Sequence, residues 1–184
     1  AGKTTLMRMI CGLLTMDEGE INVLGLNVAT EVETVQSKIS YMPQRFGLYD
    51  DLTVQENMDL YADLKGLDLG LREQRYKMLM ELTGLSPFTT RLAGKLSGGM
   101  KQKLGLACAL IVPAELLLLD EPTVGVDPVS RRELWQIVYQ QVEQTGMTVL
   151  LSTAYLDEAE RCTNVILLHE GRMVSQGSPK GFSD

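Results

Sequence analysis

Two short apolar runs in the second half of the chain predict strands that are buried inside a sheet. The run 116–119 consists of four leucines between Pro113 and Pro122, and it is too short for a typical helix. The run 148–152 is rich in leucine and β-branched residues. Unbroken hydrophobicity is typical of strands covered on both faces of a parallel sheet, so we predict an α/β fold with a mainly parallel sheet flanked by helices.

Apolar residues at helical spacing predict the helices around this sheet. The spacing is found at 6–14, 54–61, 76–82 and 100–110, and a further helix is expected at 131–143 with Asp127 or Ser130 as its N-cap. The character of the chain changes between Leu52 and about Leu85, which indicates a helical insertion. We therefore expect one domain over 1–184 with a helical subdomain at about 50–112.

The remaining predicted elements are short. Strands are expected at 20–24 and 38–42, and a C-terminal hairpin is expected from 165–168 and 172–175. Glu170 and Gly171 would form the turn of this hairpin. A short helix is expected at 157–161.

Composition and charge narrow the classes of function. The 184 residues are 45% hydrophobic and 22% charged, and no apolar run approaches the roughly 18 residues of a membrane span. A formal net charge of −7 argues against non-specific electrostatic binding to nucleic acid. The 3 cysteines are odd in number and widely spaced, which favours free buried thiols of a reducing cytosol over disulfides or a metal site.

The first five residues, Ala1-Gly2-Lys3-Thr4-Thr5, resemble the second half of a phosphate-binding loop, whose full pattern requires another glycine upstream. Glycine lets backbone N–H groups approach phosphates, the Lys3 ammonium group can pair with phosphate oxygens, and the Thr4 hydroxyl can ligate Mg²⁺. The helix that follows would point its positive N-terminus at the phosphates. A helix that begins with this pattern by chance is the alternative. We also expect the chain to begin inside a domain.

Asp120 and Glu121 follow the leucine run directly, at the carboxyl end of a predicted strand. Ligands of open α/β sheets bind beyond this edge, where Asp120 can serve a metal ion and Glu121 can orient or deprotonate a water molecule. A buried strand that ends in a polar turn explains the same two residues without chemistry. The phosphate loop is the observation that favours the catalytic interpretation.

Ser97, Gly98 and Gly99 open another predicted helix and form a second candidate anion site. Ser97 is a good N-cap, and two glycine amides beside it suit a phosphate at a helix N-terminus. An ordinary capped helix explains them equally well. Gln44, just past the strand at 38–42, can ligate Mg²⁺ or hold a water molecule, although an exposed loop amide is the commoner explanation for such a residue.

Five motifs in order resemble the ATPase domain of the ATP-binding cassette (ABC) superfamily over nearly the whole chain. They are Gly2-Lys3-Thr4-Thr5, Gln44, Leu96-Ser97-Gly98-Gly99, Asp120-Glu121 and Val126-Asp127. The resemblance implies a P-loop NTPase fold and an ATPase that uses ATP and Mg²⁺. It also implies that two such domains close head to tail around two ATP molecules.

The resemblance implies a role for each matched residue. Phosphate binding would fall to Gly2, Lys3, Thr4 and Thr5, and Mg²⁺ binding to Thr4, Gln44 and Asp120. Glu121 would be the general base, supported by Gln44, which would also signal to a membrane partner. The ATP held by the opposite domain would be contacted by Ser97, Gly98 and Gly99, and Asp127 would lie at the dimer seam.

The surroundings of these motifs are similar to cassettes of ABC-2 type multidrug exporters, above all those with two cassettes in one polypeptide. The similar segments are 41–44, 48–50, 52–57 and 155–160. The implied partners are a second cassette, in the same polypeptide or in a homodimer, and a transmembrane permease, with no direct contact to nucleic acid. The implied location is the cytoplasmic face of the cell membrane, as a peripheral subunit.

Two other functions stay open from the sequence. The first is a soluble tandem-cassette ATPase that acts on the ribosome. The second is a purely regulatory nucleotide-binding module, although an intact Glu121 argues against complete loss of catalysis.

Ala154 departs from the family pattern, because members usually carry a histidine there that contacts the γ-phosphate and the attacking water. Loss of one preorganised group of this kind typically costs about 2.7 to 4 kcal/mol, or about a hundred- to a thousandfold in rate. We therefore expect the site built on Lys3 to turn over slowly, while Ser97 completes a competent site on a partner cassette. The alternative is that Thr153, Tyr155 or an ordered water replaces the histidine.

Overall fold

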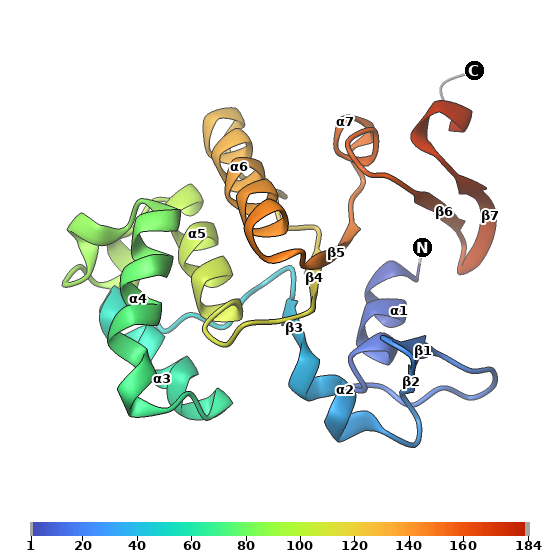
Figure 1. The fold of residues 1–184 in the computed structure, drawn as a ribbon. Coiled ribbons are helices and arrows are strands. Elements are labelled where there is room, and N and C mark those ends of the chain that lie inside the picture. Colours follow the sequence, from blue (N-terminus) through green and yellow to red (C-terminus); the bar gives the residue numbers. More distant parts are fainter. Residues whose placement is uncertain (1, 183–184) are drawn as a thin grey trace.

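Within residues 2–182, which the computed structural model describes, a parallel sheet of three strands lies at the centre of the fold (Figure 1). Its order is β3 (Ile39–Met42), β4 (Leu116–Asp120) and β5 (Thr148–Ser152), so β4 is the middle strand. This sheet and its flanking helices confirm the predicted α/β fold. Ala1, which begins the predicted phosphate loop, and residues 183 and 184 lie outside the described residues.

Side chains of β4 alternate between two apolar layers, one on each face of the sheet. Leu117 and Leu119 belong to a large cluster that includes α5 (Gly98–Ala109) and α6 (Pro128–Thr145). Leu116 and Leu118 belong to a smaller cluster that includes α1 (Lys3–Ile10) and α2 (Val32–Lys38). All residues of β4 are buried, which explains why its hydrophobic run does not alternate.

The helices between β3 and β4 pack together on the side of the sheet away from α1 (Figure 1). They are α3 (Val54–Lys65), α4 (Leu69–Thr83), two short 3₁₀ turns at Ser86–Phe88 and Ala93–Lys95, and α5. Thr53 is the N-cap of α3 and forms a capping box with Glu56. The Thr53 hydroxyl accepts from the Glu56 N–H, and the Glu56 carboxylate accepts from the Thr53 N–H, each at 3.0 Å. The boundaries of the helical subdomain stay a prediction.

Several boundaries near the N-terminus differ from the predicted ones. Helix α1 ends at Ile10, because Gly12 has a φ of +72° that no helix continues, and Leu13 and Leu14 are exposed rather than on an apolar helix face. The strand expected at 20–24 shrinks to β1 (Asn22–Val23), paired with β2 (Leu26–Asn27). Helix α2 was missed because its seven residues bury only Val35.

The C-terminal elements confirm the predicted order with shifted ends. Strands β6 (Val165–His169) and β7 (Arg172–Gly177) form the expected antiparallel hairpin. Its two turn residues have φ of +48° and +76°, as required by the commonest two-residue hairpin turn. The short helix α7 (Leu156–Ala159) begins one residue earlier and ends two residues earlier than expected. In the described part of the chain, no helix has both the length and the hydrophobicity to span a membrane.

The cysteines are free, in part as predicted. Cys11 and Cys108 are buried, and burial raises the pKa of each thiol to about 12. Cys162 is only half-buried, so the expectation of buried thiols is wrong for this residue.

Candidate active site

The N-terminus of α1 lies against the carboxyl end of β4 and brings together residues far apart in sequence. The Thr4 hydroxyl donates to an Asp120 carboxylate oxygen at 2.8 Å. The Lys3 ammonium nitrogen lies 3.1 Å from a Glu121 carboxylate oxygen. The two halves of the candidate site, predicted separately from a loop motif and a strand end, therefore form one cluster.

A small hollow opens where this cluster meets solvent. Its volume is about 260 Å³, and it is lined by Gly2, Lys3, Thr4, Thr5 and Glu121. Gly2 is the N-cap of α1 and has a φ of +86°, a left-handed conformation that favours glycine. The hollow therefore combines a helix N-terminus with a lysine and hydroxyl groups, which suits an anion.

Asp120 is held rigidly although it is almost fully buried. Besides the bond from Thr4, its carboxylate accepts a hydrogen bond from the Ser152 hydroxyl at 2.5 Å and a long one from the Tyr41 hydroxyl at 3.5 Å. Burial, followed by the nearby Asp120 charge, raises the pKa of Tyr41 above its usual value. Since three elements supply these donors, the carboxylate is fixed before any ligand arrives.

Glu121 has an unusual backbone conformation for a residue with a side chain. Its φ is +45°, in the left-handed region where non-glycine residues are strained. The Glu121 N–H donates to both the carbonyl and the hydroxyl oxygen of Ser152, at 3.0 Å each. The neighbouring strand thus stabilises the strained turn, and the turn directs the carboxylate toward Lys3.

Gln44 and Ala154 follow the two outer strands at the same edge of the sheet. Met42 pairs with Leu119, so Gln44 falls level with Glu121 in the strand register, and its side chain is exposed. Ala154 is exposed two residues beyond the end of β5. Gln44, Glu121 and Ala154 therefore each follow a strand end at the same edge of the sheet.

The second predicted anion site lies on the other face of the sheet. Ser97 is the N-cap of α5, as predicted, and its hydroxyl accepts from the Met100 N–H at 3.2 Å. Ser97 and Gly98 are exposed, whereas Gly99 is buried. Figure 1 shows α5 and α1 on opposite sides of the strands, so the structure does not bring Ser97 into the cluster around Lys3.

Gly99 and Asp127 meet where α5 approaches α6. A Cβ atom at Gly99 would lie 2.1 Å from the Ser130 hydroxyl oxygen and 3.5 Å from an Asp127 carboxylate oxygen. Asp127 rather than Ser130 caps α6, because its carboxylate accepts from the Ser130 N–H at 3.0 Å. This backbone hydrogen bond holds the pKa of Asp127 below its usual value.

Sequence reasoning missed three residues that shape this region. The Ser152 hydroxyl donates to Asp120 and accepts from the Glu121 N–H. Its role follows from the strand register, in which Ser152 pairs with Asp120 across β4 and β5. Thr123 and Glu158 form a buried hydrogen bond behind the site. No sequence signal for that pair was available, because a carboxylate on a short helix predicts exposure.

Comparisons with known proteins agree with this geometry. A family model described as ABC transporter matches residues 1–124. A probable multidrug ABC transporter ATP-binding protein, YbhF, of Escherichia coli is 56% identical over 100% of this chain and 32% of its own length. The daunorubicin/doxorubicin resistance ATP-binding protein DrrA of Streptomyces peucetius is 38% identical over 97% of this chain and 54% of its own length. The chain thus spans about a third to a half of these relatives.

Solved structures show the same fold. CbiO1 of Clostridium perfringens, part of an ABC transporter complex, superposes with a TM-score of 0.87 at 25% identity, covering 98% of this chain and 74% of that one. A dimeric ATP-binding cassette in a post-hydrolysis state with ADP and Pi gives 0.84 at 25% identity, covering 97% and 81%. By family match, relatives and fold, the chain belongs to the ABC transporter family.

Proposed function

We propose that this chain binds ATP at the hollow beside Lys3 and hydrolyses it. The observation that carries the proposal is the pairing of Thr4 with Asp120 and of Lys3 with Glu121 at one edge of the sheet. A helix N-terminus, a lysine, a buried carboxylate and a strained, partly exposed glutamate provide the groups needed for phosphoryl transfer to water.

Some of these residues would bind the nucleotide and others would catalyse its hydrolysis. Backbone N–H groups at the start of α1 and the Lys3 ammonium group bind the β- and γ-phosphates, so Lys3 exchanges its Glu121 partner for phosphate oxygens. Glu121 then orients the attacking water and accepts its proton as general base. Gln44, which follows the end of the neighbouring strand β3, would hold the same water or the metal ion.

The donor set of the site fits Mg²⁺. Mg²⁺ prefers oxygen ligands and is commonly held by one or two protein groups plus phosphates, and the Thr4 hydroxyl and Asp120 carboxylate provide such oxygens 2.8 Å apart. When bound, Mg²⁺ would neutralise charge that develops on the phosphate oxygens.

A second cassette completes the site. Ser97 and Gly98 are open to solvent at a helix N-terminus on the face of the sheet away from Lys3. They therefore suit the γ-phosphate of ATP held by another cassette, with Asp127 at the seam. The solved post-hydrolysis cassette named above is dimeric, which supports this arrangement.

The energy of hydrolysis would drive export through a transmembrane permease of the ABC-2 type. The names of the E. coli and Streptomyces relatives refer to multidrug transport and drug resistance, and they support a role in export. The chain would act as a peripheral subunit on the cytoplasmic face of the membrane. The relatives named here give no support to the alternative of a ribosome-acting ATPase.

The site built on Lys3 would turn over slowly. The contacts of the two neighbours of Ala154 support this: the Thr153 hydroxyl already donates to Glu158 at 2.6 Å, and the Tyr155 ring stacks against the Arg131 guanidinium group, whose carbon lies 4.6 Å from the ring centroid. These contacts favour a slow ATP site over substitution by either side chain.

Single-turnover hydrolysis in the complete protein tests the proposal, with the catalytic glutamate of any second cassette replaced by glutamine. Glu121→Gln should lower the rate by about 10² to 10⁴, because a general base typically contributes that factor, while ATP still binds. Lys3→Met should instead weaken ATP binding. Glu143→Gln, the same change at an exposed position of α6, is the matched control. Hydrolysis at the unmodified rate in Glu121→Gln would overturn the proposal.

A further inference from the structure

Glu158 is a buried carboxylate behind the candidate active site. It lies on the four-residue helix α7, and only 2% of its surface is exposed. Burial of a charge is costly unless hydrogen bonds or an opposite charge compensate it. Its nearest cationic nitrogen, on Arg131, is 3.8 Å away, so hydrogen bonds provide most of the compensation.

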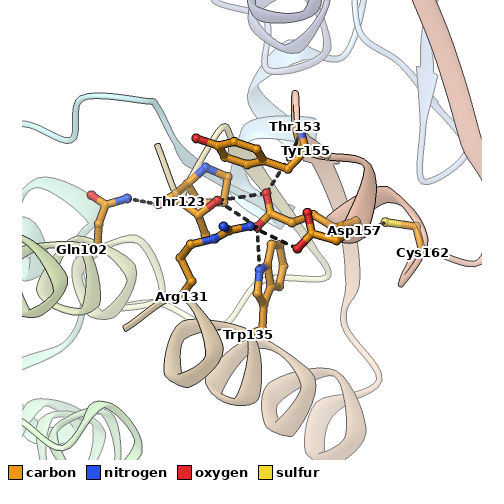
Figure 2. Close-up of polar contacts among 10 residues, drawn as sticks. Gln102, Thr123, Arg131, Trp135, Thr153, Tyr155, Asp157 and Cys162 are labelled. Carbon is orange, nitrogen blue, oxygen red and sulfur yellow. Dashed lines mark hydrogen bonds and ion pairs between the residues drawn. The ribbon is translucent and has the colours of Figure 1, made fainter. Parts of the chain in front are cut away.

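Three side chains donate to this carboxylate. The Thr123 hydroxyl lies 2.9 and 2.8 Å from its two oxygens, the Thr153 hydroxyl 2.6 Å from one, and the Trp135 indole nitrogen 2.6 Å from the other. Figure 2 shows Thr123, Thr153 and Trp135 pointing toward one another from separate parts of the chain. Both carboxylate oxygens are therefore satisfied, and the arrangement is specific for an acceptor with two oxygens.

The donors belong to the two loops that carry the candidate chemistry. Thr123 lies two residues after Glu121, in the loop that continues to Asp127. Thr153 directly precedes Ala154, and its hydroxyl also accepts from the Tyr155 N–H at 3.0 Å. Since β4 and β5 are paired neighbours, Glu158 connects the loops that leave the ends of both strands.

Helix α5 contacts the same loop from the other side. The Gln102 side-chain amide donates to the Pro122 carbonyl oxygen, one residue before Thr123 (Figure 2). Gln102 lies on the helix whose N-terminus is formed by Ser97 and Gly98. The loop after Glu121 is thus fixed between α5 and Glu158.

We propose that Glu158 is a positioning residue for hydrolysis, because it holds the Thr123 loop and the Thr153 loop in one arrangement around Glu121. The proposal rests on the proposed function of the site. Glu158 itself does not reach the phosphates, and it acts on the rate through the positions of Glu121 and of the backbone at Ala154. Misplacement of a reacting group by about 1 Å can lower a rate by about a hundredfold, so the loops need such a restraint.

The test uses single-turnover hydrolysis and ATP affinity of the complete protein, again with only the site at Lys3 able to turn over. Thr123→Val and Thr153→Val each remove one donor with little change in shape. Each should lower the rate by about ten- to a hundredfold and leave ATP affinity within about twofold. Thr123→Ser keeps the hydroxyl and should therefore keep the unmodified rate.

Double variants test whether these residues act together. Glu158→Gln combined with either valine variant should lower the rate no further than Glu158→Gln alone, since all of them act through one carboxylate.

Thr83→Val is the matched control, because the Thr83 hydroxyl is also buried but bonds only carbonyl groups of its own helix, the nearer at 2.7 Å. It should lower the melting temperature without changing the rate. The positioning role is overturned if Thr123→Val and Thr153→Val keep the unmodified rate, or if Thr83→Val slows hydrolysis as much as they do. Glu121→Gln in the same background separates the two proposals. If Glu121→Gln abolishes turnover while the threonine variants keep it, only the positioning role of Glu158 is overturned. If Glu121→Gln leaves turnover intact, the proposed function itself is overturned.

Discussion

Ala154 is the residue at which we expect this site to differ in chemistry from other ABC cassettes. It is exposed and lies two residues past the end of β5, at the same edge of the sheet as Glu121. The Thr153 hydroxyl donates to Glu158, and the Tyr155 ring packs on Arg131.

Ala154→His should accelerate hydrolysis at this site by about a hundred- to a thousandfold, because it restores one preorganised group near the γ-phosphate. The measurement is single-turnover hydrolysis in the complete protein with the other cassette inactivated. Leu156→His is the control, since Leu156 is also exposed and lies two residues further along. An equal gain in both variants, or none in Ala154→His, would rule out the slow-site interpretation.

At the scale of elements, the approach of α5 to α6 gives different roles to the two glycines of the motif Leu96-Ser97-Gly98-Gly99. A Cβ atom at Gly98 would have no heavy atom within 4 Å, whereas one at Gly99 would lie 2.5 Å from the Ser130 Cβ atom. Gly98 is therefore free for a ligand to approach, while Gly99 is required by helix packing. The motif would thus combine the proposed binding role of Gly98 with a packing requirement at Gly99.

Gly99→Ala should destabilise the contact between α5 and α6 by about 1–3 kcal/mol, as is typical of overpacking. The double variant with Ser130→Gly, which removes the opposing atoms, should recover part of this loss. Gly98→Ala should keep the stability but slow hydrolysis on the partner cassette. Hydrogen exchange of α5 and α6 together with thermal unfolding measures the first two effects. Unchanged exchange in Gly99→Ala would contradict the packing requirement.

For the whole molecule, the two proposed phosphate-binding features lie on opposite faces of one sheet. The N-terminus of α1 belongs to the layer with α2, and α5 belongs to the layer with α6. A rigid sheet cannot fold around a nucleotide to bring both features together. The proposed head-to-tail arrangement of two cassettes would solve this problem, because each would cover the phosphates of the other.

A cysteine at Ser97 should therefore crosslink to a cysteine at the position equivalent to Thr5 in the opposite cassette, and only when ATP is bound and Glu121→Gln prevents hydrolysis. The crosslink is read from a shift in mobility or a new linked peptide, in a background with Cys162→Ser because that thiol is half-buried. Ser97→Cys alone is the control. Equal crosslinking with and without ATP would contradict closure driven by the nucleotide.

Much of the fold and of the cluster around Lys3 could be predicted from the sequence. The run of four leucines predicted a strand buried on both faces, and β4 is fully buried. Asp120 and Glu121 could be placed because the carboxyl end of a parallel strand is a defined location. By contrast, Leu13 and Leu14 continued a helical pattern that Gly12 interrupts, so local spacing alone gave a helix that was too long.

The sequence by itself determined which residue types stand at strand ends and helix starts, because these follow from local periodicity and motif spacing. Only the tertiary structure decided which of them meet: Thr4 with Asp120 across 116 positions, Gln102 with the Pro122 carbonyl, and Glu158 with Thr123 and Thr153. The physical reason is that hydrogen bonds between distant segments depend on how the strands pair and how the helices cover the two faces. Neither is encoded within one local stretch of chain.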